Sequence, residues 1–164
     1  MAVKTPVNDD AHEAKCRRCG VSCHFAVPIN GLPVVVDDIH CPYLEGTGQG
    51  TFRCTVYEER FKYAPWCHTV DSSLKNGLLA QDCLYTDAVP GYRGKTRLST
   101  RLEQRVLPHV RADLIAHGVP VGVSTEGVQR FLQRTGGGHW AFELSEDGSR
   151  LRIRPADFSS NPTE

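Results

Sequence analysis

The chain has 164 residues, of which 40% are hydrophobic and 8% aromatic, so it is long enough for one compact domain or two small ones around a small core. Its 19 Lys and Arg residues equal its 19 Asp and Glu residues in number, which excludes the strong overall field that draws a protein to nucleic acid or to an anionic membrane. The N-terminus lacks the apolar segment of a secretory signal, and no stretch reaches the roughly 18 apolar residues of a membrane span. We therefore expect a cytoplasmic protein with no membrane partner.

All seven cysteines lie between Cys16 and Cys83. In a reducing compartment a cluster of thiols binds metal more often than it forms disulfides, and an odd number of thiols cannot all pair. The sequence therefore predicts a metal-binding module followed by a region without cysteine. The predicted boundaries are a flexible tail at 1–11, a cysteine-rich metal-binding module at 12–90, a C-terminal region of helices and a β-hairpin at 91–158, and a second tail at 159–164.

The module opens with two thiols separated by two residues, Cys16 and Cys19, and Gly20 follows them. This short spacing lets both sulfur atoms reach one ion, while glycine permits the positive φ angle that turns the backbone around it. The other thiols follow at intervals of loop length, at Cys23, Cys41, Cys54, Cys67 and Cys83. We expect that bound metal, rather than a large apolar core, holds this half of the chain together.

Short extended segments are predicted between the thiols. Residues 25–29 and 33–36 have the composition of strands, and the Asn-Gly pair at 30–31 is a turn signal. The glycine-rich stretch 46–50 lacks the lysine and hydroxyl of a phosphate-binding loop, so we interpret it as a hairpin connection. Residues 52–57 alternate as a strand would, or they begin a short helix.

Four motifs of the module occur in a recognisable order: C-x2-C-G-x2-C-H from Cys16, C-P-x-L from Cys41, C-x-V-Y-E-x-R from Cys54 and P-x-C ending at Cys67. Together they resemble the bacterial cysteine-cluster proteins of the YkgJ type, over about residues 14–70. The resemblance implies chelation of zinc or iron, without an established reaction. The chain departs from the family pattern at Ser22, where the family has the first of two adjacent cysteines, and Cys83 is a candidate replacement for that ligand.

Two zinc ions in tetrahedral sites need eight ligands, or fewer if a thiolate bridges them. The seven cysteines and one histidine would complete that number. His24 and His68 each follow a cysteine directly, which makes them the first candidates, and His40 ranks third. An iron site or an iron–sulfur cluster is the alternative, because it uses the same soft thiolate donors. We favour one or two zinc ions, since charged residues surround the thiols and no second cofactor motif accompanies them.

Past Gly91 the pattern becomes helical. Apolar residues recur at intervals of four in a stripe formed by Leu98, Leu102, Val106, Val110 and Leu114. This spacing predicts a helix that has its cap at 99–100, ends at Gly118, and either kinks or divides near Pro108. We expect the apolar stripe to join the C-terminal region to the metal-binding module.

A second helix and a β-hairpin complete the predicted fold. The helix runs from a cap at Ser124 or Thr125 to Arg134, and residues 140–144 and 150–154 alternate as two strands. The expected fold class is α+β, with a small, irregular, loop-rich, metal-stapled N-terminal module packed on two helices and a β-hairpin.

Three classes of function remain open. The first is a binding or adaptor module with a structural metal and an unidentified protein partner, and the second is an iron-dependent redox protein or enzyme. The third is a nucleic-acid-binding protein, in which Tyr92 and Trp140 could stack on bases. The basic residues that would contact the phosphates are Arg93, Lys95, Arg97, Arg101, Arg105, Arg150, Arg152 and Arg154. Acidic residues interrupt this charge, so a solvated surface explains the basic residues better than nucleic-acid binding does.

If a thiol is free for nucleophilic catalysis, Cys83 is the candidate, because it lies outside the family pattern.

Overall fold

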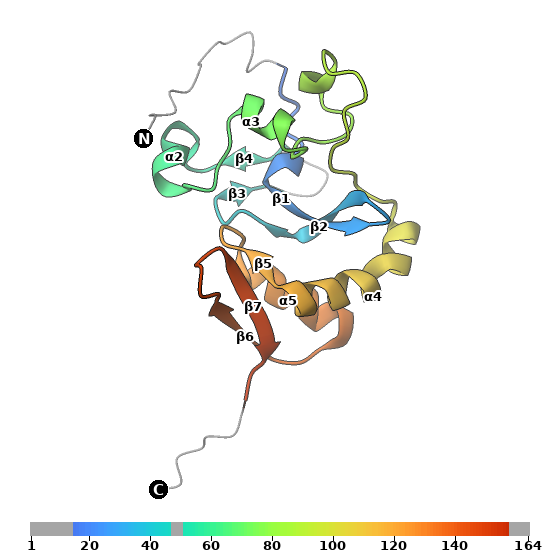
Figure 1. Cartoon of the computed structure of the whole chain (residues 1–164), viewed down its shortest axis with the longest axis vertical. Coiled ribbons are helices and arrows are strands. Elements are labelled where there is room, and N and C mark those ends of the chain that lie inside the picture. The colour runs from blue at the N-terminus through green and yellow to red at the C-terminus, as the bar shows by residue number, and fades with distance from the viewer. Residues whose placement is uncertain (1–14, 47–50, 158–164) are drawn as a thin grey trace, which may run out of the picture.

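A β-hairpin lies at the centre of the fold. A computed structural model describes residues 15–46 and 51–157, and in it β1 (His24–Ile29) pairs antiparallel with β2 (Leu32–His40) (Figure 1). The connecting residues Asn30 and Gly31 both have positive φ angles, of 50° and 78°. An Asn-Gly pair adopts this conformation readily, and its twist matches that of the strands. The predicted strands and turn are therefore confirmed, and β2 extends beyond its predicted end.

The C-terminal region forms two helices and a small antiparallel sheet. Helix α4 spans Thr100–His117 and α5 spans Thr125–Gly136. The sheet has the strand order β5-β7-β6, with β5 at Val119–Pro120, β6 at Trp140–Leu144 and β7 at Arg150–Pro155. The helices and the β6–β7 hairpin confirm their predictions and the α+β class, and β5 joins β7 as a third strand.

The main core lies between the central hairpin and the C-terminal elements. Strand β2 packs on α5, and α4 packs on β7. Figure 1 shows α4 and α5 beneath the hairpin, with the thiol-bearing loops on its other side. The buried residues of this core are Val27, Val36, Ile39, Val110, Leu114, Val119, Val128, Phe131, Leu132 and Ile153.

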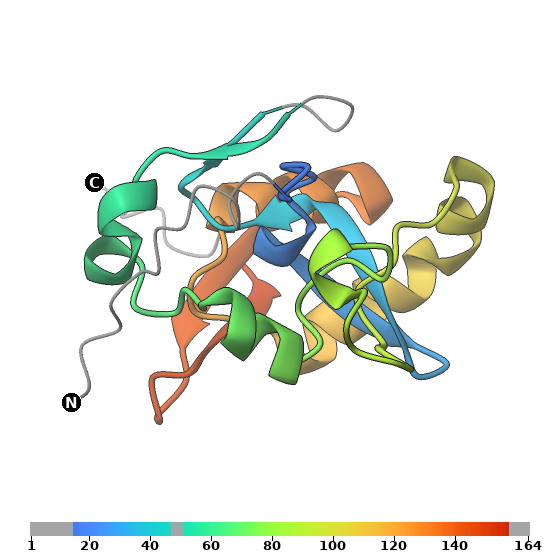
Figure 2. The same ribbon diagram turned by 90° about the horizontal axis from the view of Figure 1, so that it is seen from above.

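The apolar stripe of α4 is only partly correct as predicted. Val110 and Leu114 are buried and Val106 packs against the core, but Leu102 is 48% exposed. The physical reason is that the N-terminal turns of α4 lie at the edge of the molecule, as Figure 2 shows, where no element covers them. Only the C-terminal half of the helix therefore joins the two regions.

Helix α4 also continues through Pro108 without dividing into two helices. Proline removes one backbone hydrogen bond, to the carbonyl of Gln104. Both residues are exposed, so water can satisfy that carbonyl.

The loop-rich region contains only short elements among the described residues. They are η1 at Val21–Cys23, β3 at Leu44–Glu45, β4 at Arg53–Cys54, η2 at Tyr57–Glu59, α2 at Arg60–Tyr63, α3 at Val70–Lys75 and η3 at Leu84–Thr86. The predicted tails at 1–11 and 159–164, and residues 47–50 of the predicted hairpin connection, lie outside the described residues. In the part of the chain that is described, no helix is both long and apolar enough to cross a membrane.

A pair of variants on α4 tests the corrected stripe. Leu114 is fully buried whereas Leu102 is 48% exposed. We expect Leu114→Ala to lower the free energy of unfolding by about 2–5 kcal/mol, because it leaves a cavity. Leu102→Ala should change it by no more than about 0.5 kcal/mol. Urea denaturation followed by circular dichroism measures both values, and equal losses would contradict this position of the core.

Candidate metal-binding site

The register of the central hairpin brings Cys23 and Cys41 together. His24 pairs with His40 at the open end of the hairpin, so the two cysteines follow as the next residues outward. The backbone N–H of Cys41 donates to the carbonyl oxygen of Cys23 at 2.9 Å. Two thiols that are 18 positions apart in the chain thus begin from neighbouring backbone positions.

A second strand pair adds Cys54. Strand β3 follows a turn in which the N–H of Leu44 donates to the carbonyl oxygen of Cys41 at 3.1 Å. Leu44 is paired with Cys54 across β3 and β4, and the N–H of Thr55 donates to Tyr43 at 2.9 Å. Cys54 is therefore fixed beside the turn that begins at Cys41.

An aromatic contact positions Cys67. The ring of Trp66 stacks on that of Tyr43 with centroids 6.4 Å apart and planes inclined by 10°. The N–H of Cys67 also donates to the carbonyl of Ala64 at 2.8 Å. Gly122 lies directly against the indole of Trp66, so closely that a Cβ at this position would approach the ring to 2.5 Å. The Trp66–Cys67 segment is thus held between the turn after β2 and the loop before α5.

We call Cys23, Cys41, Cys54 and Cys67 the four-thiol group. Burial raises the pKa of the Cys23 thiol to about 11, and a hydrogen bond with Ser22 acts in the opposite direction. Negative charge on Cys41, Cys67 or Cys54 would raise the pKa of Cys23 further. Burial likewise raises the pKa of Cys67, where Arg60 acts in the opposite direction. The thiols are therefore close enough to interact electrostatically, and partial burial favours the protonated forms of Cys23 and Cys67.

The other three cysteines gather on the N-terminal knuckle. Arg18 and Gly20 have positive φ angles of 53° and 69°, and the N–H of Arg18 lies 3.4 Å from the sulfur of Cys16. At Gly20 a Cβ would approach the ring of Phe52 to 2.7 Å, which explains the glycine. The tight backbone turn predicted for this motif is confirmed at the level of backbone conformation.

Cys83 lies against this knuckle. It packs with Cys19 on a small buried cluster of Val21, Val35 and Ala80. The adjoining guanidinium of Arg17 forms an ion pair with Asp82 at 3.0 Å and also donates to the Asp82 carbonyl at 3.0 Å. Burial raises the pKa of Cys83, and the thiolates of Cys19 and Cys16 would raise it further. We call Cys16, Cys19 and Cys83 the three-thiol group.

All seven thiols are free. Within residues 15–46 and 51–157, no three His, Cys, Asp or Glu side chains are arranged so that they could hold one metal ion together as they stand. The donor set nevertheless suits a soft metal, because it consists of thiols on neighbouring backbone segments. Binding would require cysteine side chains to change between staggered rotamers.

The candidate histidines each have one ring nitrogen engaged. The Nδ1 atoms of His24 and His40 lie 2.7 Å and 2.9 Å from the carbonyls of Gly20 and Cys41. Nδ1 of His68 lies 3.0 Å from the hydroxyl of Ser72. A carbonyl partner fixes the hydrogen on Nδ1 and leaves Nε2 as the ligand atom, the arrangement that metal-binding histidines use. Burial also lowers the pKa of His24 and so favours its neutral form.

Lys95 is buried. The expectation that it belongs to a basic surface cluster is therefore wrong. The residue is 8% exposed. Its ammonium donates to the carbonyls of His24, Ser22 and Val21 at 2.6, 3.2 and 3.4 Å. Burial lowers its pKa to about 8, and the Cys23 thiolate acts in the opposite direction. Lys95 therefore secures the turn that carries Cys23 and brings positive charge to the four-thiol group.

Other residues proposed for nucleic-acid contact are also engaged within the protein. Arg150 donates to the carbonyls of His117 and Gly118 at the end of α4, at 2.9 and 3.0 Å. Arg154 pairs with Glu143 at 3.0 Å. The indole of Trp140 donates to Gly137 and has the guanidinium of Arg111 5.2 Å from its ring centroid. These contacts favour a structural role for the basic side chains that make them.

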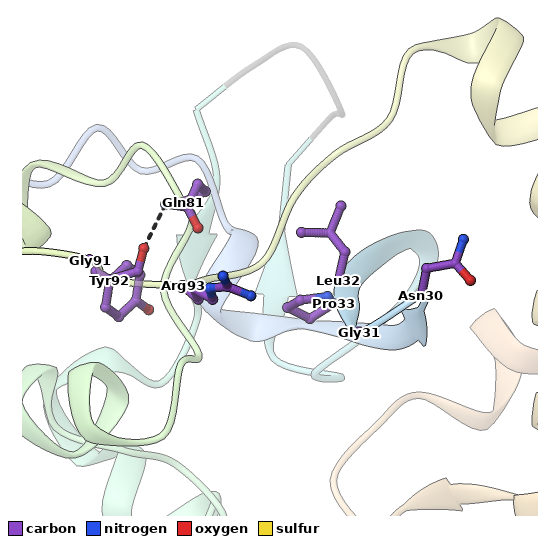
Figure 3. A pocket seen from close by; sticks show the side chains of 8 residues that line it. All are labelled: Asn30, Gly31, Leu32, Pro33, Gln81, Gly91, Tyr92 and Arg93. Atoms are coloured by element: carbon purple, nitrogen blue, oxygen red, sulfur yellow. Dashed lines mark hydrogen bonds between the residues drawn. The ribbon is translucent and has the colours of Figure 1, made fainter.

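A shallow pocket of about 420 Å³ lies between the β1–β2 turn and the loop that carries Tyr92 (Figure 3). Its lining residues are Asn30, Gly31, Leu32, Pro33, Gln81, Gly91, Tyr92 and Arg93. Gln81 donates to the Tyr92 carbonyl at 2.7 Å and accepts from the N–H of Gly94 at 2.8 Å. None of the residues that line the pocket is a cysteine.

Comparisons with protein-family models, curated proteins and solved structures found no match to this chain. The resemblance to YkgJ-type proteins therefore stays a hypothesis that depends on the four motifs alone.

Replacing Lys95 tests its role at the four-thiol group. Lys95→Met keeps the length of the side chain but leaves three carbonyls without their buried donor. We expect the metal-free protein to lose about 1–3 kcal/mol of unfolding free energy. Lys75→Met, at an exposed residue, is the control and should change stability by no more than about 0.5 kcal/mol. Matching urea midpoints for the two variants would exclude this role.

Proposed function

We propose that this chain is a metal-binding protein in which the four-thiol group holds a zinc ion that stabilises the fold. The observation that carries the proposal is that three separate contacts, the β1–β2 register, the β3–β4 pair and the Tyr43–Trp66 stack, bring the backbone segments of these four cysteines next to one another, although their side chains as they stand do not surround one ion. Four thiolates are the donor set of structural zinc sites.

The surroundings of the four-thiol group support a negatively charged centre. Four thiolates around Zn²⁺ carry a net charge of −2, which is costly in a partly buried site unless nearby charges or donors offset it. Lys95 and Arg60 supply positive charge to Cys23 and Cys67. The indole N–H of Trp66 is buried and has no hydrogen-bond partner among the described residues. A metal-bound sulfur would be a suitable acceptor for that group.

The proposed role of the metal is structural, and the protein would act as a binding or adaptor module for another protein. This role requires a reducing compartment such as the cytoplasm, in which the thiols stay free. Iron or an iron–sulfur cluster would use the same donors, and it remains the alternative occupant. The basic C-terminal residues give the nucleic-acid alternative less support, because several of them are engaged internally.

Replacing one cysteine of the group tests the assignment. We expect Cys41→Ser to lower the zinc content by one ion per chain and to reduce the unfolding free energy, since binding energy at a structural site contributes to folding. Ser73→Ala serves as a control, because Ser73 is buried but lies in α3, outside both thiol groups. Elemental analysis and urea denaturation provide the two readouts, and undiminished zinc in Cys41→Ser would refute the assignment.

The affinity for zinc should depend steeply on pH. The pKa of Cys23 is about 11 and burial also raises the pKa of Cys67, so burial favours the protonated thiols, which must lose their protons to bind. We expect the apparent affinity to rise with pH between about 6 and 8, by about one order of magnitude per pH unit for each proton released. Competition with a chelator of known affinity measures this slope. An affinity that does not change with pH would show that the ligands are not these thiols.

A further inference from the structure

Strand β6 is an edge of the C-terminal sheet, and within the described part of the chain it pairs only with β7. Figure 1 shows β6 at the margin of the molecule. The other edge strand, β5, has two residues and ends at Pro120, and both features discourage pairing with another chain. Strand β6 has five residues without proline or lysine, and its register with β7 contains no bulge. Its outer edge therefore lacks these protections.

Two hydrogen bonds show which backbone groups of β6 face outward. The N–H of Ser145 donates to the Arg150 carbonyl at 2.9 Å, and the N–H of Ala156 donates to the His139 carbonyl at 2.9 Å. Along an antiparallel pair, residues that bond to the partner strand alternate with residues whose N–H and C=O point away from it. Odd-numbered positions of β6 therefore bond to β7, and even-numbered positions face the open edge. The outward-facing residues are Trp140, Phe142 and Leu144.

The same three residues form an apolar row. Their side chains share one face of the sheet, because side chains alternate along a strand. Trp140 and Phe142 pack against the main core, whereas Leu144 is 58% exposed, the largest fraction among the large hydrophobic residues that the structure describes. The open edge thus combines outward-facing backbone groups with an apolar row that ends in an uncovered leucine.

A second copy of β6 complements this edge when the strands run antiparallel with Phe142 opposite Phe142 of the second copy. Trp140 then lies opposite Leu144 of the second copy, and the reverse. Each of these three pairs can exchange N–H and C=O hydrogen bonds, because all the groups concerned face the open edge. The indole of one copy would cover the exposed leucine of the other.

Charge favours this register over its neighbours. A register centred on Glu143 would place two carboxylates directly opposite each other, which is destabilising. A register centred on Ala141 would leave Leu144 beyond the end of the second strand. With Phe142 at the centre, Glu143 lies opposite Ala141 of the second copy, which is paired with Arg154 on β7. Arg154 binds Glu143 of its own chain at 3.0 Å and its side chain is 63% exposed, so it would adjoin the incoming carboxylate as well.

We propose that the outer edge of β6 is a dimerisation surface, through which two copies of the chain join their sheets into one continuous antiparallel sheet. The twofold axis passes at Phe142, so both copies contribute the same residues. An edge of five residues is small beside a standard interface of about 1,200–2,000 Å², so the dimer is weak and forms at high protein concentration. The strand contains no cysteine, and this property is independent of the proposed metal site.

Sedimentation equilibrium of the full-length protein tests this surface, with a reducing agent present to exclude disulfide-linked dimers. Leu144→Lys places a charge opposite Trp140 of the second copy. Leu102→Lys is the matched control, because Leu102 is 48% exposed and lies in α4, outside the sheet. We expect the unmodified chain to show a monomer–dimer equilibrium whose dissociation constant rises by at least about tenfold in Leu144→Lys and stays unchanged in Leu102→Lys.

Hydrogen exchange of the backbone amides at low and high protein concentration tests the register in the unmodified chain. We expect exchange at Trp140, Phe142 and Leu144 to slow at the higher concentration, while Ala141 and Glu143 are protected at both because they bond to β7. A chain that stays monomeric up to about 1 mM would overturn the proposal. A dimer that is equally stable in Leu144→Lys, or exchange at the three outward-facing residues that does not depend on concentration, would also overturn it.

Discussion

The pairing of β1 with β2 determines the positions of both the core and the thiols. Val36 and Ile39 contribute to the core shared with the C-terminal helices, whereas Val35 contributes to the cluster under Cys19 and Cys83. Val35 and Val36 face opposite sides because side chains alternate along a strand. Val36 and Ile39, three residues apart, reach the same core across the irregularity at which the pairing with β1 shifts register. At the open end, beyond a register shift between His24 and Ala26, the pairing of His24 with His40 places Cys23 beside Cys41. A slip of one residue would exchange the two faces and separate the thiols, so the register is a constraint on the whole molecule.

Buried charge connects the hairpin to the thiols. Lys95 donates to three carbonyls around Cys23, and its burial is costly unless those hydrogen bonds are made. In the metal-free protein the ammonium faces a protonated thiol, because the pKa of Cys23 is about 11. With zinc bound, it would face a thiolate.

Local sequence signals predicted those parts of the fold that depend on local chemistry. The Asn30-Gly31 turn was predictable because few residue pairs tolerate two positive φ angles. The start of α5 was predictable because the Ser124 hydroxyl accepts from the N–H of Gly127 as an N-cap. The exposure of Leu102 and the burial of Lys95 were not predictable, because they depend on which distant segment covers each side chain.

The candidate site was predicted in its composition but not in its arrangement. The sequence identified all seven cysteines as candidate ligands, and spacing suggested only that Cys16 and Cys19 act together. The separation into groups of four and three depends on contacts between distant segments, such as the Tyr43–Trp66 stack and the Arg17–Asp82 ion pair. Cys83, far from the knuckle in sequence, could be assigned to it only from the fold.

Elemental analysis of the full-length protein, purified anaerobically without added metal and read beside its visible spectrum, tests the central claim most directly. We expect at least one zinc ion per chain and no visible absorbance, since Zn²⁺ has a filled d shell. Protein that is folded and contains no metal would contradict the claim that a metal ion holds the thiol-bearing loops together.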